Sequence, residues 1–144
     1  MPGPGRTVLP SRIIKESIWT SPNLNQLSVA AERHFYRILP LPDDFGCFEA
    51  TPDVVRGRCY PLKESVRSRD IEAWQSELEQ KRLIVRWMVG GRQYAVFPKW
   101  KSHQRIRSTH QRKTPEPPPE VVAKCEQIEA FDDTCQQLTA SDDK

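Results

Sequence analysis

The sequence lacks any long hydrophobic run. No stretch of the 144 residues approaches the roughly 18 consecutive apolar residues that a membrane-spanning helix needs. The first ten residues also lack the apolar run of a secretory signal. We therefore expect a cytoplasmic protein that does not contact membranes.

Cysteine is scarce and is poorly placed for metal binding. The four cysteines form no Cys-x-x-Cys pair, and no histidine lies beside one at the short separations of zinc knuckles. We expect no metal ion and no cofactor, and interpret Cys47 and Cys59 as small core residues with reduced thiols. The histidines, His34, His103 and His110, have no clustered carboxylate, serine or cysteine partner, so we expect no enzymatic activity.

Negative charge is sparse over most of the chain. Residues 1–113 hold 20 Lys and Arg against 11 Asp and Glu, a net charge of +9, whereas residues 114–144 hold two lysines against eight acids, a net charge of −6. The overall net charge of +3 hides this division. A basic body attracts polyanions, and an acidic tail either competes for the same surface or binds a different partner.

The first half of the chain predicts two helices and a strand. Apolar residues at helical spacing predict a helix over residues 29–39, which follows the N-cap Ser28. A short strand is expected to begin at Cys47 and to end at Thr51. Thr51 is expected to cap a second helix, about two turns long, that opens with Pro52.

A longer helix and a hairpin follow. Ser68 is expected to cap a longer helix, whose apolar stripe extends as far as Leu83. The β-rich runs 84–89 and 92–97 are separated by Gly90-Gly91, a pair that accepts the positive φ angles of a type I′ turn. These runs therefore predict a β-hairpin.

Helix, short strand, short helix, longer helix and hairpin is the order of a winged helix-turn-helix domain. We predict this α+β fold for residues 11–98, with a three-helix core, a small antiparallel β-sheet and a wing hairpin. Residues 1–10 are expected to be a disordered N-terminus and residues 99–113 a basic extension. Residues 114–144 are expected to form a proline-rich linker and an acidic tail, with weak helical periodicity over residues 121–138.

The basic extension is the clearest functional signal. Its sequence, KWKSHQRIRSTHQRK, contains six Lys or Arg, two His and no acid. Such a run neutralises DNA phosphates and releases counterions, which gives a slope of about −5 in log K against log salt concentration if all six cations engage. The alternative is a solvated basic strip without a partner. The candidate DNA contacts in this segment are Lys99, Lys101, His103, Arg105, Arg107, Arg112 and Lys113.

A second set of candidate DNA contacts lies within the domain. Cations follow the short helix, the loop after it and the start of the longer helix, where this fold faces the DNA backbone, and one is at the wing tip. They are Arg56, Arg58, Lys63, Arg67, Arg69 and Arg92.

The longer helix has two interpretations of equal weight. Four of its residues are expected to be exposed and to contact base edges, since Arg recognises guanine, Gln adenine and Glu cytosine. These residues are Arg69, Glu72, Gln75 and Ser76. Alternatively, because Glu72, Glu77 and Glu79 make the helix nearly neutral, it is a scaffold whose exposed face repels misplaced phosphates.

The four tryptophans divide into two groups. Trp19, Trp74 and Trp87 lie within apolar patterns, so we expect them in the core. Trp100 lies at the junction of the hairpin and the basic extension, where a core role and a base-stacking role both stay open.

Four stretches of the chain together match a known pattern. They are Lys15-Glu16-Ser17-Ile18-Trp19, Leu27-Ser28 through Leu41, Asp43-Asp44-Phe45-Gly46-Cys47-Phe48, and Trp100-Lys101-Ser102-His103-Gln104-Arg105-Ile106. Through them, residues 12–107 resemble the winged-helix N-terminal domain of phage replisome-organiser and DnaD-like replication initiation proteins. The resemblance implies binding of origin DNA, self-association through this domain, and recruitment of a replicative helicase or its loader.

Three functions remain in competition. The leading hypothesis is a non-enzymatic protein that binds double-stranded DNA in phage or bacterial replication initiation. An alternative is a transcriptional regulator, because a winged helix does not identify the process that uses it. The third is a protein-interaction module that forms a homodimer and whose acidic tail, including Phe131 and Leu138, docks on another replisome component.

Overall fold

The structure, a computed structural model, describes residues 11–104 and 112–142. The expected disorder of residues 1–10 lies outside this part of the chain, and so do the candidate contacts Arg105 and Arg107. The side chain of His103 also lies outside it.

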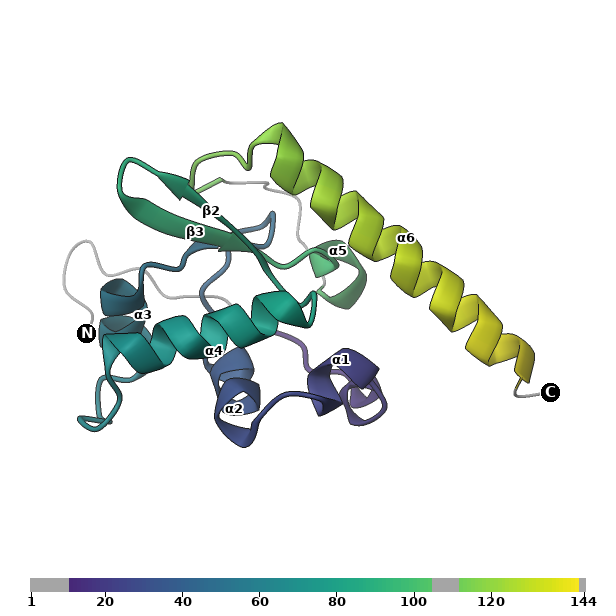
Figure 1. Cartoon of the computed structure of the whole chain (residues 1–144), viewed down its shortest axis with the longest axis horizontal. Helices are drawn as coiled ribbons and strands as arrows, with labels where there is room; N and C mark the ends of the chain where they lie inside the picture. The colour runs from purple at the N-terminus through teal and green to yellow at the C-terminus, as the bar shows by residue number, and fades with distance from the viewer. Residues whose placement is uncertain (1–10, 105–111, 143–144) are drawn as a thin grey trace.

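Helices and a small sheet alternate along the described chain, which gives an α+β fold (Figure 1). The helical elements are η1 (Glu16–Trp19), α1 (Pro22–Asn25), α2 (Val29–Ile38), α3 (Pro52–Cys59), α4 (Ser68–Gln80), α5 (Trp100–His103) and α6 (Pro119–Asp142). The strands are β1 (Cys47–Glu49), β2 (Val85–Val89) and β3 (Arg92–Val96).

The three strands form one antiparallel sheet in the order β1-β3-β2. The predicted hairpin is confirmed: Val89 pairs with Arg92 next to the turn, and Gly90 and Gly91 both have positive φ angles, 56° and 79°. Both positions of a type I′ turn require such angles, which cost glycine little because it has no Cβ.

The caps of the two predicted helices turn out differently. The Ser28 hydroxyl accepts a hydrogen bond from the Ala31 amide (3.2 Å), which confirms it as the N-cap of α2. Thr51 does not cap α3 with its side chain. Its hydroxyl instead donates to Glu49 (2.9 Å) and accepts from the Gln93 amide (3.0 Å), because β1 ends at Glu49 and leaves that amide without a strand partner.

The main core lies between the helices and one face of the sheet. Its largest fully buried members include Ile38, Phe48, Ile71, Leu78 and Ile84. The core extends past the expected boundary at residue 98, because the indole of Trp100 is 4% exposed and stacks on Phe97. Trp100 is therefore a core residue.

Trp19 does not lie in the core, although its apolar surroundings in the sequence predicted that it would. Its side chain is 75% exposed. Contacts to the backbone hold η1 in place, since the Asn25 amide donates to the carbonyls of Ile18 (3.0 Å) and Trp19 (3.2 Å). The indole is not needed to anchor the turn.

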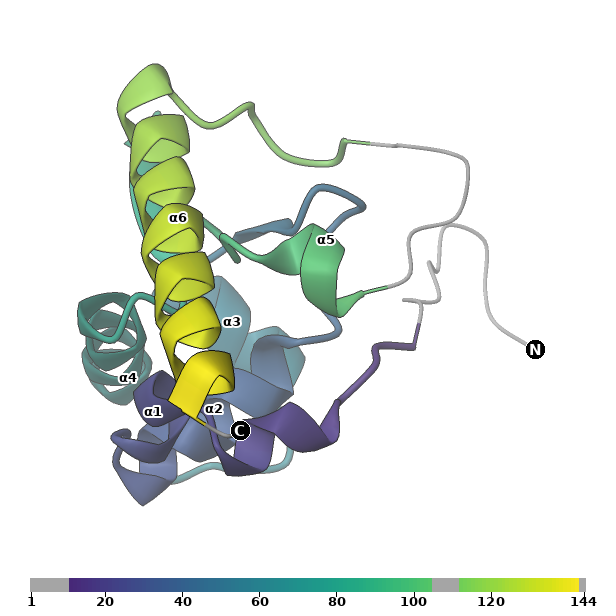
Figure 2. The same ribbon diagram turned by 90° about the vertical axis from the view of Figure 1, so that its right-hand side faces the viewer.

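Helix α6 covers the other face of the sheet. Val121 is buried against Cys47, Val85, Trp87 and Val96, and further residues of α6 pack on the same cluster. The weak periodicity over residues 121–138 thus corresponds to a real helix, and the segment expected to be a linker and tail begins as part of the folded domain. Figures 1 and 2 show the second half of α6 extending past the sheet.

The chain between α5 and α6 is fixed to the domain on both sides of residues 105–111. The Gln104 amide accepts from the Ile13 N–H (2.9 Å) and donates to the Ile13 carbonyl (3.0 Å). The buried Asp43 carboxylate accepts from the Lys113 N–H (3.1 Å) and the Thr114 hydroxyl (3.2 Å). The ends of the described basic extension therefore belong to the folded body.

Candidate nucleic-acid interface

The first turns of α3 and α4 are held together. Ser68, the first residue of α4, donates its hydroxyl hydrogen to Asp53 in the first turn of α3. Asp70 accepts from the Arg67 amide (2.9 Å) and so satisfies one of the unpaired N–H groups at the start of α4. These contacts fix the position of the loop between the two helices.

The turn end of the hairpin lies in the same region. Arg92, the first residue of β3, forms an ion pair with Glu49 (3.6 Å), which accepts the Thr51 hydroxyl at the start of α3. In Figure 1 the hairpin turn, α3 and the loop after it all lie toward one end of the long axis. The predicted backbone-facing loop and the predicted wing therefore share one end of the molecule.

Six of the predicted DNA contacts lie in this region, and all six are exposed. We call this set the cationic end: Arg56, Arg58, Lys63, Arg67, Arg69 and Arg92. Within residues 52–70, five cations face three acids, two of which, Asp53 and Asp70, accept the hydrogen bonds described above. The cationic end thus carries a surplus of positive charge.

The candidates of the basic extension that the structure describes lie on a different surface. Lys101 on α5 is exposed and Lys99 is half-buried, and Figure 2 shows α5 on the side of the molecule opposite α4. Arg112 is half-buried, with its guanidinium 4.1 Å from the ring centre of Phe45 and Nη1 donating to the Cys47 sulfur (3.7 Å). The described cations are therefore divided between two surfaces.

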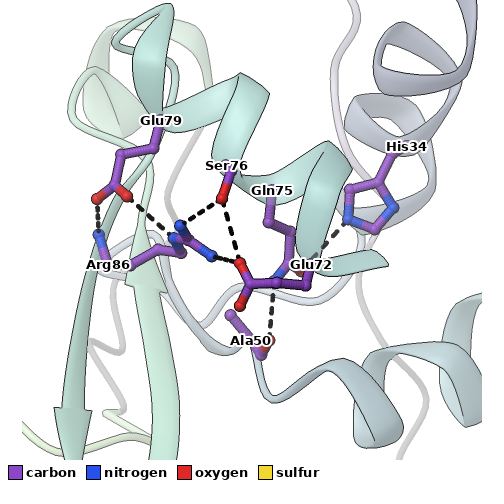
Figure 3. A network of polar contacts seen from close by, with 7 residues as sticks. All are labelled: His34, Ala50, Glu72, Gln75, Ser76, Glu79 and Arg86. Carbon is purple, nitrogen blue, oxygen red and sulfur yellow. Dashed lines mark hydrogen bonds and ion pairs between the residues drawn. The ribbon is translucent and has the colours of Figure 1, made fainter. Parts of the chain in front are cut away.

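Gln75 is not an exposed contact, and this prediction is wrong. Its side chain is fully buried, and its amide nitrogen donates to the Ala50 carbonyl (2.9 Å) (Figure 3). Ile71, Gln75 and Leu78 share the core-facing stripe of α4. That spacing was visible in the sequence and could have placed Gln75 inside.

The Gln75 amide also determines which ring nitrogen of a buried histidine carries the proton. Its oxygen lies 3.3 Å from Nε2 of His34, and because that oxygen only accepts, Nε2 carries the proton. Nδ1 of His34 lies 2.8 Å from the Tyr60 hydroxyl and accepts from it. Burial lowers the pKa of His34 to about 4. The imidazole is thus neutral and structural.

Arg86 on β2 connects α4 to the hairpin, and no local pattern in the sequence marks it as a connecting residue. Its backbone N–H and Nε both donate to Glu79 (3.0 Å each), and Nη2 donates to Ser76 (3.0 Å). Nη1 completes the set on Glu72, as Figure 3 shows. Burial by itself lowers the pKa of Arg86, but the hydrogen bonds to the two carboxylates outweigh it and raise that pKa.

Two features are absent from residues 11–104 and 112–142. No group of three or more His, Cys, Asp or Glu side chains in them is placed to hold a metal ion. No helix in them is both long enough and apolar enough to cross a bilayer.

Comparison of the chain with protein-family models, curated proteins and solved structures finds no match.

Proposed function

We propose that this protein binds double-stranded DNA through the cationic end. The observation that carries the proposal is that six exposed cations on α3, the following loop, α4 and β3 lie on elements tied together by Asp53–Ser68 and Glu49–Arg92. A surface of this kind neutralises successive phosphates and gains free energy from counterion release. The contacts between the elements hold the cations in a fixed arrangement, which lowers the ordering cost of binding.

We further propose that the domain is a winged helix. The order α2-β1-α3-α4-β2-β3, with the sheet order β1-β3-β2, matches the expected succession of helices, strand and hairpin. On this proposal the β2–β3 hairpin is the wing, and Arg92 lies next to its turn, beside the start of α3. Helix α6, packed on the outer face of the sheet, is an addition to that arrangement.

The process that we propose is replication initiation, and it rests on the resemblance of residues 12–107. A homodimer and a replicative helicase or helicase loader are the partners that the same resemblance implies. Regulation of transcription is the alternative on the same architecture. The projecting second half of α6 favours, as a further candidate, docking on another replisome component.

The proposal is tested by fluorescence anisotropy with a labelled duplex and a matched pair of variants. Lys63→Glu reverses an exposed charge on the cationic end, and Lys124→Glu makes the same change on α6. We expect the first variant to weaken binding about tenfold and to reduce the salt slope by about 1, and the second to bind like the wild type. Equal loss in both variants, or no binding by the wild type, would contradict the proposal.

A further inference from the structure

Helix α4 is the element that would enter the major groove if the domain docks as winged helices do. Recognition of a base sequence there requires side chains whose hydrogen-bond donors and acceptors are available to the base edges and are not engaged within the protein. Four residues of α4 were candidates for base contacts. In the structure, three of them are held by contacts within the protein.

Gln75 is the first of the three that is not available for base contacts. Its amide lies in the core and holds the Ala50 carbonyl, so rotating it toward DNA would leave a buried acceptor without a partner. The position also lies on the opposite face of α4 from Ala73, which is exposed.

Glu72 and Ser76 are held by hydrogen bonds to Arg86 and are therefore not available for base contacts. Glu72 Oε2 accepts from both the Ser76 hydroxyl (3.2 Å) and Arg86 Nη1, and the Ser76 hydroxyl accepts from Arg86 Nη2. For Glu72 to accept from a cytosine it would have to give up a guanidinium whose side chain is 15% exposed. Separating such a pair costs more than a surface ion pair does, because one partner is largely desolvated.

The other polar side chains of α4 are engaged or out of reach. Glu77 accepts from the Ser28 amide (2.5 Å) and hydroxyl (3.0 Å), and Glu79 holds Arg86. Gln80 is the last residue of the helix, about 16 Å along the axis from Arg69 at 1.5 Å per residue. Base contacts come from the N-terminal part of a recognition helix, where Arg69 stands as the remaining candidate.

We infer that the cationic end binds duplex DNA through its phosphates and does not discriminate base sequence. The inference rests on the proposed function and names its substrate class: double-stranded DNA of any sequence. One arginine on α4 is insufficient for a site, because each good bidentate base contact contributes about 1–3 kcal/mol of discrimination. A protein that recognises its site binds it about 10³-fold to 10⁷-fold more tightly than other DNA.

Arg86 acts in this binding as a positioning residue. It neutralises Glu72 and Glu79, two carboxylates that would otherwise repel phosphates near α4, and it holds β2 against that helix. Its removal should weaken the binding of all duplexes by the same factor, whereas the removal of a base-contacting residue would change the ranking of sequences.

The test is a selection of bound duplexes from a random-sequence library, followed by anisotropy titrations on unrelated duplexes of equal length and similar base composition. We expect no enriched motif and dissociation constants that agree within about threefold, far below the specificity ratio of site-specific proteins. An enriched motif, or a duplex bound more tightly than the others by more than this factor, would overturn this inference and leave the proposed function intact. Absence of binding to every duplex would overturn both.

A pair of variants tests the role assigned to α4. Glu72→Gln keeps the shape of the side chain and removes its charge, and Gln80→Glu places a new charge at the far end of the same helix. For folded Glu72→Gln protein, checked by circular dichroism, we expect selection again to yield no motif and all duplexes to change affinity by one common factor. A new base preference at a single position in that variant would show that residue 72 contacts bases, and would overturn the inference.

Discussion

Arg86 and Glu79 are joined by two hydrogen bonds of 3.0 Å each, one from the backbone N–H of Arg86 and one from its Nε. The pair therefore fixes the main chain of β2, as well as a side chain, against α4. Glu72 and Ser76 extend the same contact along the helix. The hairpin and α4 meet through polar groups here, beside the apolar core.

Replacing Arg86 by Ala should destabilise the protein. The change removes hydrogen bonds between charged groups and leaves the Glu72 and Glu79 carboxylates without their cation, so we expect the free energy of unfolding to fall by about 2–3 kcal/mol. Urea denaturation measures it. The control Arg58→Ala removes an exposed arginine from α3 and should stay within about 0.5 kcal/mol of the wild type. Equal effects of both substitutions would show that the network contributes no stability.

The protein should become less stable as the pH falls, because the folded state favours the neutral form of His34. Its pKa is lowered by burial from 6.5 to about 4, so the folded state favours the neutral imidazole. This contribution is fully present above pH 6.5 and is lost progressively as the pH falls toward the folded pKa. Carboxylates titrate in part of this range, so the measurement is the difference between wild type and His34→Gln in urea denaturation from pH 7 to pH 4. A difference that does not change with pH would contradict the assignment.

Gln75 should affect stability and leave DNA affinity unchanged. Gln75→Leu has a similar volume but leaves the Ala50 carbonyl and His34 without their partner, so we expect a loss of about 1–3 kcal/mol in thermal or urea denaturation. At temperatures where the variant is folded, its affinity for duplex DNA should equal that of the wild type. Weaker binding with unchanged stability would show that Gln75 contacts DNA.

Two glycines provide a matched pair. A Cβ at Gly46 would lie 2.7 Å from the Trp100 side chain, and the residue has a φ of +81°. Gly46→Ala should therefore cost at least about 2 kcal/mol. At Gly57, inside α3, a Cβ meets nothing within 4 Å, so Gly57→Ala should stabilise the protein by about 0.5–1 kcal/mol. Comparable melting temperatures for the two variants would contradict the packing of Trp100.

Local signals explain the parts of the fold that the sequence predicted well. Ser28 before an apolar helical pattern and Gly90-Gly91 between two β-rich runs act within a few residues, so their consequences are visible without the rest of the chain. The start of α4 was anticipated to within one residue, but Ser68 is its first residue and not its cap. Arg67 occupies the N-cap position, and the Ser68 hydroxyl donates to Asp53.

The missed features depend on contacts between distant residues. Thr51 bonds to Gln93, and Arg86 is held by a helix that precedes it in the chain. The covering of the sheet by α6 depends on Val121 meeting strands from three other segments. A local sequence pattern does not identify such partners. For the same reason, the sequence did not show that the cations are divided between two surfaces.

The salt dependence of duplex binding tests the central claim most directly. If all six cations of the cationic end contact phosphates, log K measured by anisotropy should fall against log salt concentration with a slope of about −5. Lys63→Glu should then give a shallower slope than Lys124→Glu. Binding that is absent at low salt, or that is equally strong at about 50 mM and about 200 mM salt, would contradict an interface built from these side chains.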